Sequence, residues 1–367
     1  MRALNLFIGL LIPAILLMVS WVIVEESCLT NNDNILGHTF LVQVGFGTSD
    51  GMHEEQQTQS TSIDDVSPLH SVSAVSSEPP ILNDPYVDKQ WALSQVQATS
   101  LWQITMGNPE ILVAVLDTGI DQNHEDLNGK VVAEVNFTDS PTSDDIHGHG
   151  THVAGIIVAN SNNEIGIAGF APESRLMNVK VADDEGRCQA TVIAKGIIWA
   201  VDNGASVINI SLELKEPSSE LEDAINYAWD QGAIVMVAAG NNGSDLPVYP
   251  AYYENSVAVA AIRQNDSLAP LSNHGDWVDV AAPGFNIYST LPGDDYGYKS
   301  GTSFATAYAS GLAALLFSVV TDTNNNGRVN DEVRAALEAG CYEISAKGVG
   351  AGRIGAINSL VQMGYTS

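Results

Sequence analysis

Short apolar runs alternate with stretches of helical periodicity along the last three quarters of the chain. We expect strands at 111–116, 175–181, 205–212, 233–239, 256–262 and 277–282. Helices are expected at 150–159, 189–203, 219–231 and 303–320. Strands that are apolar on both faces and separated by helices are typical of a parallel sheet covered on both sides. The pattern predicts an α/β fold of three layers, whose functional residues gather at the carboxyl ends of the strands.

The beginning of the chain has a different pattern. A mostly apolar run covers residues 3–24, with Arg2 before it and Glu25 after it. Its length of about 20 residues and its positive flank fit a cleaved export signal or a retained membrane anchor, and a buried core helix is the alternative. We therefore expect a protein that is secreted, or tethered through residues 3–24 to the outer face of the cell membrane.

The segment 26–80 is rich in Ser, Gln, Thr, Asp and Glu, and only residues 38–45 have strand character. This composition indicates a polar linker or a short pro-segment. The predicted parts of the chain are thus a signal or anchor at 1–25, a linker or pro-segment at 26–80, and one folded domain at 81–367.

Charge and cysteine content exclude several classes of function. Asp and Glu number 44 against 14 Lys and Arg, a formal net charge of −30, which argues against nucleic acid as a partner because phosphates would be repelled. The odd set Cys28, Cys188 and Cys341 excludes a fully paired internal disulfide framework, and no C-x-x-C supports a cysteine zinc site.

Four polar residues stand where such a sheet would place a site. Asp117 directly follows the run 111–116, His149 opens a predicted helix, Ser303 opens another, and Asn241 follows the run 233–239. Each has a simpler explanation when taken alone: a turn cap, a member of a histidine cluster, a helix cap and a turn asparagine. Together they supply an orienting acid, a base, a nucleophile and an oxyanion donor.

The surrounding residues form the motifs DTGID (117–121), HGTHVAGI (149–156), AAGNNG (238–243) and GTSFAT (301–306), in that order. In these motifs the chain resembles the subtilisin-like serine proteases, the subtilase family, and within it the thermitase group, over roughly residues 82–362. The resemblance implies a serine endopeptidase that acts on proteins or peptides, with a subtilisin-like sheet of about seven strands. We expect it to be a monomer.

The resemblance also implies the roles of the site residues. Ser303 attacks the scissile carbonyl, His149 takes and returns the proton, Asp117 orients His149, and Asn241 binds the oxyanion together with the Ser303 amide. The residues implied to line the substrate cleft are Ser211, Leu212, Glu213, Gly186, Ala238, Gly240 and Thr302.

A structural calcium ion is a further implication of the resemblance. The Asn-rich loop 160–167, which we expect to interrupt a helix, would wrap the ion. The implied ligands are side chains of Asp84, Asp126 and Asn163 and carbonyls of Asn160, Ile165 and Ile167, and hard oxygen donors suit Ca²⁺. Asp139 and Asp144 are candidates for a weaker second site. The segment 322–333 resembles an EF-hand loop, but Val333 stands at its last ligand position and a plain connector between helices explains it equally well.

The chain departs from the family pattern at several positions. Glu213 and Leu214 replace two glycines in the wall of the pocket for the residue before the cut, which narrows this pocket or favours a basic side chain. Cys188 replaces a glycine in the segment that pairs with substrate. Ala307 and Tyr308 replace a proline and a histidine after the nucleophile. Two alternatives follow: a peptide ligase on the same fold, suggested by Ala307, and a catalytically silent binding protein, suggested by Glu213 and Leu214.

Overall fold

The computed structural model describes residues 20–27, 39–46 and 82–365 of the chain, which divides into two units, 1–67 and 68–367. In the first unit, strand β1 (Ser20–Ser27) pairs antiparallel with strand β2 (Thr39–Phe46). The strand expected at 38–45 is thus confirmed. The end of the apolar run lies in β1 instead of a helix, and residues 3–19 lie outside the described residues. Within the described ranges, no helix has the length and apolar character needed to cross a membrane.

The second unit is built on a seven-stranded sheet in which every neighbouring pair of strands is parallel. The strand order is β4-β5-β3-β6-β7-β8-β9. The strands are β3 (Leu112–Asp117), β4 (Val131–Asn136), β5 (Arg175–Lys180), β6 (Ala205–Ile210), β7 (Ile234–Ala238), β8 (Ser256–Ile262) and β9 (Val280–Pro283). The α/β fold and its seven strands are confirmed.

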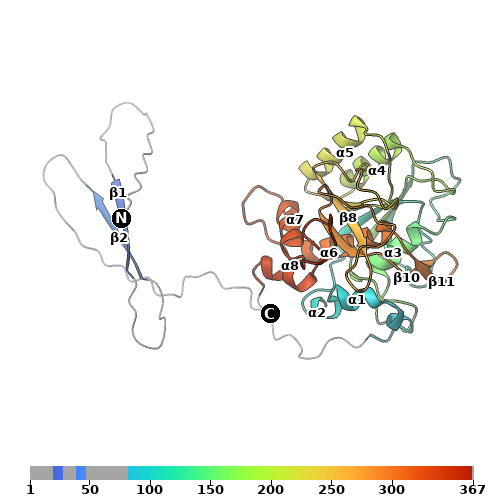
Figure 1. Ribbon diagram of the computed structural model, residues 1–367, viewed down its shortest axis with the longest axis horizontal. Coiled ribbons are helices and arrows are strands. Elements are labelled where there is room, and N and C mark those ends of the chain that lie inside the picture. The colour runs from blue at the N-terminus through green and yellow to red at the C-terminus, as the bar shows by residue number, and fades with distance from the viewer. Residues whose placement is uncertain (1–19, 28–38, 47–81, 366–367) are drawn as a thin grey trace. The chain divides into compact units, whose positions relative to one another are not determined.

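Helices cover both faces of this sheet (Figure 1). The 3₁₀ helix η2 (Val87–Lys89) and helices α1 (Trp91–Gln95) and α2 (Ala98–Leu101) precede the sheet. The remaining elements are α3 (Gly150–Val158), α4 (Ala190–Asp202), α5 (Ser219–Asp230), the hairpin strands β10 (Ile287–Leu291) and β11 (Asp295–Lys299), α6 (Thr302–Phe317), α7 (Asn330–Ala339) and α8 (Ala356–Gln362). Helices α4 and α5 pack together over one face, and α3 and α6 pack together over the other.

Alternate residues of the central strand β3 face the two helical layers. Val113 and Val115 belong to the hydrophobic core under α3 and α6, whereas Ala114 and Leu116 belong to the core under α4 and α5. All four are fully buried, as the apolar run predicted. This arrangement fixes the strand on both faces and presents Asp117 at its carboxyl end.

The structure differs from the expected elements in one additional strand, in the end of one helix and in the position of one loop. Strand β4 was not predicted, because it lies at the edge of the sheet and its residues alternate between partly buried and exposed. Helix α6 ends at Phe317 and not at residue 320, since the β-branched pair that follows continues the apolar pattern outside the helix. The loop 160–167 follows the end of α3 at Val158 and leads toward β5, so it terminates a helix and does not interrupt one.

Candidate active site

Asp117 and His149 lie in direct contact. His149 Nδ1 donates a hydrogen bond to Asp117 Oδ1 at 2.7 Å, and the amide of Thr118 donates to the same oxygen at 2.7 Å. Asp117 is the last residue of β3 and is fully buried, while His149 immediately precedes α3. A side chain at Gly150 would collide with the Gly119 carbonyl, so glycine is needed for this close approach of helix and strand.

A second buried carboxylate, Asp145, fastens the loop that carries His149. Asp145 Oδ1 accepts from Thr118 Oγ1 and from the amide of Gly148, both at 2.8 Å. Its Oδ2 accepts from the amide and the hydroxyl of Thr151, at 2.8 and 2.7 Å. Asp145 therefore joins the end of β3 to both sides of His149. The sequence analysis did not identify this residue, and its only signal was an aspartate four residues before His149.

The charges around His149 determine its protonation. Burial opposes protonation, but the charge and the hydrogen bond of Asp117 outweigh it and raise the pKa of His149 above its ordinary value. Lys299, whose Nζ donates to the Gly148 carbonyl at 2.6 Å, acts in the opposite direction by charge repulsion. Burial also lowers the pKa of Lys299 itself. The arrangement favours an imidazole that can accept a proton on Nε2.

Ser303 is buried in the first turn of α6. The ring of Phe304, the next residue, packs against the His149 imidazole with 5.6 Å between centroids. Ser303 Oγ donates to the Ser211 carbonyl at 3.3 Å, and Ser211 Oγ donates to the Ser303 carbonyl at 3.2 Å. Among the described residues no hydrogen bond joins Ser303 to His149, a looseness that is common before substrate binds.

Asn241 has its amide oriented by the start of the same helix. Its Oδ1 accepts from the amide of Thr302 at 2.8 Å and from Thr302 Oγ1 at 3.2 Å. Asn241 is itself exposed, and within the described residues its Nδ2 makes no hydrogen bond. Thr302 also accepts from the amide of Gly240 at 3.1 Å, so the loop after β7 and the start of α6 hold each other in place.

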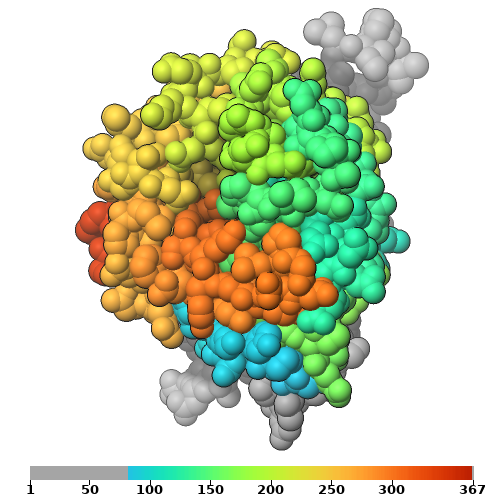
Figure 2. Space-filling model, turned by 90° about the vertical axis from the view of Figure 1, so that its right-hand side faces the viewer, coloured from blue at the N-terminus to red at the C-terminus, as the bar shows by residue number. Residues whose placement is uncertain are grey.

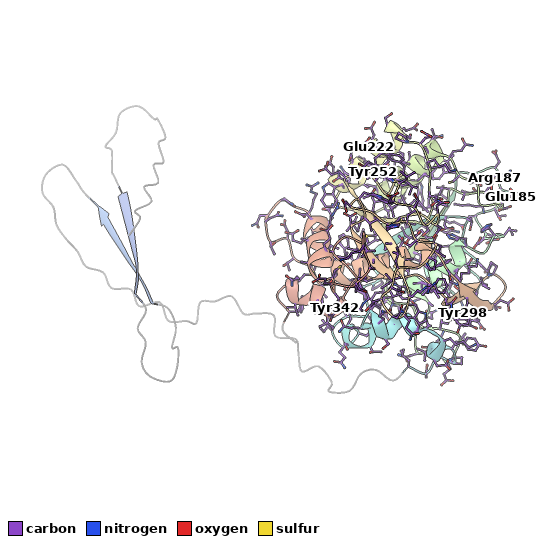
Figure 3. All side chains as sticks on the ribbon, in the orientation of Figure 1. Glu185, Arg187, Glu222, Tyr252, Tyr298 and Tyr342 are labelled. Atoms are coloured by element: carbon purple, nitrogen blue, oxygen red, sulfur yellow. The ribbon has the colours of Figure 1, made fainter. Side chains whose placement is uncertain are left out.

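Most of the predicted cleft residues lie at or just after the carboxyl ends of three strands, and Thr302 begins α6. Ser211 and Leu212 follow β6, and Ala238 ends β7. Gly186 lies in a turn after β5, where its amide donates a hydrogen bond to the Asp183 carbonyl at 2.8 Å. Beside Gly186, Glu185 and Arg187 project from the surface and form an ion pair of 2.6 Å (Figure 3).

Cys188 continues this turn and is half-buried, with its backbone bridged to Ala182. Burial raises the pKa of the Cys188 thiol to about 11. The thiol therefore stays protonated near neutral pH, and its contacts with the core under α4 and α5 give it a packing role.

The loop 160–167 gathers the expected calcium donors. Asp126 is fully buried and accepts from the amide of Ile167 at 2.8 Å and from Asn163 Nδ2 at 2.9 Å. Asp84 accepts from the amide of Asn163 at 3.1 Å. Burial raises the pKa of Asp126, and the hydrogen bonds from Ile167, Asn163 and Tyr296 offset this only in part.

Orphaned carbonyls at the same loop also fit a cation. Within the described part of the chain, no donor reaches the carbonyl oxygens of Asn160, Ile165 or Ile167, and no Lys, Arg or His pairs with Asp126. No three His, Cys, Asp or Glu side chains there form a metal-binding group. A set of two carboxylates, one amide and three carbonyls does not require such a group.

The region of Asp144 and the loop 322–333, which were the two weaker candidates for cation binding, differ from the loop 160–167. Near Asp144, the ammonium of buried Lys180 donates to the Asp144 carbonyl at 3.2 Å and pairs with Asp184 at 2.9 Å, so a cation already stands there. In the loop 322–333, Asp322 accepts from the amides of Asn325 and Gly327, at 2.7 and 2.8 Å. The loop is closed by its own hydrogen bonds, as a connector would be.

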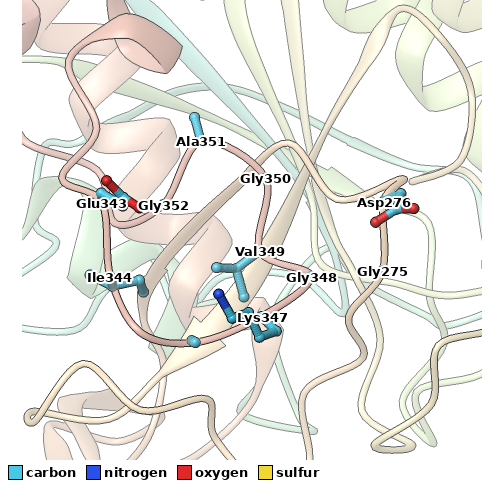
Figure 4. A pocket seen from close by; sticks show the side chains of 11 residues that line it. Gly275, Asp276, Glu343, Ile344, Lys347, Gly348, Val349, Gly350, Ala351 and Gly352 are labelled. Carbon is cyan, nitrogen blue, oxygen red and sulfur yellow. The ribbon is translucent and has the colours of Figure 1, made fainter.

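A separate pocket of about 370 Å³ lies between residues 343–352 and the pair Gly275 and Asp276 (Figure 4). It contains none of the residues discussed for catalysis or cation binding. The candidate active site lies instead at the carboxyl ends of the strands, where Asp117 ends β3 and Ala238 ends β7. Figure 2 shows the orange segment that includes the hairpin β10–β11 lying across the molecule, above the blue segment that includes α1 and α2.

The sequence and the fold both have clear relatives. The description "Subtilase family" applies to the family model that matches residues 108–350. The thermophilic serine proteinase of Bacillus sp. (strain AK1) is 45% identical over 76% of this chain and 69% of the relative. Thermitase of Thermoactinomyces vulgaris is 45% identical over 72% of this chain and 93% of the relative.

A solved structure supports the same relationship. A protease from Pseudoalteromonas arctica PAMC 21717 superimposes with a TM-score of 0.71 at 29% identity, over 77% of this chain and 99% of that one. None of these names supports a peptide ligase or a silent binding protein. The family match and the two relatives show that the chain is a serine protease of the subtilase family.

Proposed function

We propose that the protein is an exported endopeptidase that cleaves peptide bonds through an acyl-enzyme formed on Ser303. The observation that carries this proposal is the hydrogen bond between Asp117 and His149, with Phe304, the residue that follows Ser303 at the start of α6, packed against the same imidazole. Buried carboxylate, imidazole and hydroxyl in this order form the relay that a serine nucleophile needs, because a free hydroxyl is a weak nucleophile near neutral pH.

In the acylation step, Ser303 Oγ leaves the Ser211 carbonyl and turns toward Nε2 of His149. Oγ forms a bond to the substrate carbonyl carbon while its proton passes to His149. Asp117 accepts from Nδ1 and stabilises the resulting imidazolium. His149 then gives the proton to the leaving amine as the carbon–nitrogen bond breaks, and water repeats the sequence on the ester to restore Ser303.

The oxyanion of each tetrahedral intermediate is bound by Asn241 Nδ2 and the Ser303 amide. Thr302 supports this role because it holds Asn241 Oδ1, so that the amide group points its donor outward before substrate arrives. A donor that is fixed in advance stabilises developing charge without a cost of reorganisation.

The loop 160–167 binds a structural Ca²⁺ in this proposal. Its ligands are Asp84, Asp126, Asn163 and the carbonyls of Asn160, Ile165 and Ile167, and the ion would neutralise the buried carboxylate of Asp126. An ion bound only by the folded chain stabilises the fold and takes no part in peptide cleavage.

Labelling with a fluorophosphonate tests the proposed nucleophile. We expect the folded, calcium-loaded protein to gain one label on Ser303, located by mass spectrometry, and to hydrolyse peptide anilides. Ser303→Ala should show neither. An unlabelled wild-type protein with a native circular dichroism spectrum would contradict the proposal.

Intact masses of the full chain test the export segment. Trimming near residues 75–83 in the wild type, but not in Ser303→Ala, would show a self-processed pro-segment. Two full-length proteins would indicate a retained anchor or the need for another protease. Equal trimming of both would identify a host peptidase as the cause.

A further inference from the structure

Glu213 lies at the mouth of the candidate active site in a fixed segment of backbone. Glu213 lies two residues after Ser211, whose carbonyl accepts a hydrogen bond from Ser303 Oγ at 3.3 Å. On its other side, Leu214 exchanges two backbone hydrogen bonds with Tyr249, at 2.7 and 2.9 Å. The segment is therefore fastened at both ends, and the position of Glu213 relative to Ser303 is set by the fold.

The Glu213 carboxylate spans the gap between the loops that follow β6 and β7. Its Oε2 accepts from the amide of Asn241 at 3.1 Å, and its Oε1 accepts from Asn242 Nδ2 at 2.9 Å. Gly240 makes room for it, because a Cβ at this position would lie 2.5 Å from Oε2. The carboxylate thus stands next to the proposed oxyanion donor, Asn241.

The substrate residue before the cleaved bond must pass this carboxylate. When its carbonyl is attached to Ser303 and its oxygen points to Asn241, its side chain starts only a few bonds away, in the space between the two loops. Glu213 is exposed, and each of its oxygens accepts only one of the hydrogen bonds described, so lone pairs remain. In the described residues, no Lys, Arg or His forms an ion pair with it.

The chemistry of the side chain decides the energetic outcome. An apolar side chain would displace water from the carboxylate and give nothing in return. A guanidinium or an ammonium would replace that water with a charge-assisted hydrogen bond. The net charge of −30 also attracts cationic peptides at low salt.

We propose that Glu213 makes this protease select peptides with Arg or Lys immediately before the cleaved bond. The proposal rests on the proposed function, because it assumes that Ser303 is acylated and that Asn241 binds the oxyanion.

The test compares peptides that differ at this one residue, which is Arg, its neutral isostere citrulline, or Phe. We expect the wild type to cleave the Arg peptide with kcat/KM at least ~10-fold above the citrulline peptide. Glu213→Gln keeps an acceptor for the Asn241 amide but removes the charge, and should bring this ratio close to 1. Glu216→Gln removes a neighbouring exposed charge and should retain the wild-type ratio.

The outcomes separate this proposal from the one on which it rests. A wild type that is labelled by fluorophosphonate but cleaves the Arg and citrulline peptides equally would overturn the role of Glu213 alone. The same holds if Glu213→Gln lowers kcat/KM for both peptides and leaves their ratio unchanged, because Glu213 would then only support Asn241. A folded wild type that is neither labelled nor active on any peptide would overturn the proposed function, and this proposal with it.

Discussion

The candidate catalytic centre and the proposed cleft wall beside it lie at the same edge of one sheet, yet they are built differently. Asp117 and Asp145 are 0% and 3% exposed, and both accept hydrogen bonds from backbone amides. Glu213 and Arg187 are exposed, and Arg187 pairs with exposed Glu185 and with partly buried Asp183. The buried network can change only with the fold around it, whereas the wall can exchange charges and leave the sheet intact.

This difference has a kinetic consequence. A change in the buried network should alter turnover of every peptide by the same factor, because it acts on the steps that all peptides share. A change in the wall should alter the ratio between peptides. Measurements of single variants on several peptides therefore test whether the two regions act independently.

Asp117→Asn should have the largest effect. An amide that donates to Nδ1 would hold His149 in the wrong tautomer, so we expect kcat to fall about 10⁴-fold on every peptide. The enzyme concentration should be fixed by absorbance of the folded protein, and Asp276→Asn, at an exposed carboxylate in the pocket of Figure 4, serves as the control. A loss of kcat that varies strongly from peptide to peptide would contradict the expectation that the buried network acts equally on all of them.

The pH dependence of the same variant sharpens the prediction. Although burial opposes protonation, Asp117 raises the pKa of His149, and only neutral His149 can accept the Ser303 proton. Activity should therefore fall as the pH drops through this raised pKa. In Asp117→Asn the acid limb of kcat/KM should move to lower pH, and an unmoved limb would assign it to another group.

Asn241→Ala should have the next largest effect. Loss of one oxyanion donor lowers kcat by about 10²–10³ and leaves KM nearly unchanged, because the donor acts mainly on the charge of the transition state. Steady-state kinetics on an Arg and a Phe peptide would check both the size and the uniformity of the loss. A change confined to KM would place Asn241 in the cleft wall instead.

Calcium removal should change stability and leave the ratio between peptides intact. At a free ion concentration 100 times the Kd, the bound state gains about 2.7 kcal/mol, so chelation should lower the Tm by several degrees. Calorimetry with and without chelator measures this shift. Asp126→Asn should abolish the calcium-dependent part, and a variant that still responds fully to calcium would remove Asp126 from the site.

His152 should produce the smallest effect, one that appears only in acid. Burial lowers its pKa to about 3, so the unfolded chain binds a proton that the folded chain refuses once the pH falls below the ordinary histidine value. Stability should drop by ~2 kcal/mol between neutral pH and pH 5 from this residue alone. In urea titrations, the free energy of unfolding of His152→Gln should depend less steeply on pH than that of the wild type. An equal slope would show that His152 does not cause the loss of stability in acid.

The sequence predicted the elements whose signal is local. Strands buried on both faces were visible as apolar runs, and the short motifs around Asp117, His149 and Ser303 identified the candidate chemistry. Strand β4 was not predicted, because an edge strand is only partly buried and has no continuous apolar run. Asp145 escaped for a different reason: an aspartate in a polar loop looks like any surface carboxylate until the loop folds onto β3.

The contacts of Glu213 also could not be predicted from the sequence alone. Its position in the cleft wall could be predicted from the family pattern, but its partner could not. Asn241 lies 28 residues further along the chain, and the contact depends on how the loops after β6 and β7 run beside each other. Such pairings are set by strand order, which a single sequence carries only indirectly.

The hairpin β10–β11 contacts both the proposed calcium site and the proposed active site. The Tyr296 hydroxyl donates to Asp126 at 3.2 Å, and Lys299 of the same strand holds the Gly148 carbonyl beside His149. An endopeptidase cleaves opened chains of its own kind, so under the proposed function molecules whose hairpin opens should be digested by those that remain closed. The storage life of a preparation should therefore shorten as its concentration rises, and calcium should lengthen it by keeping fewer chains open to autolysis.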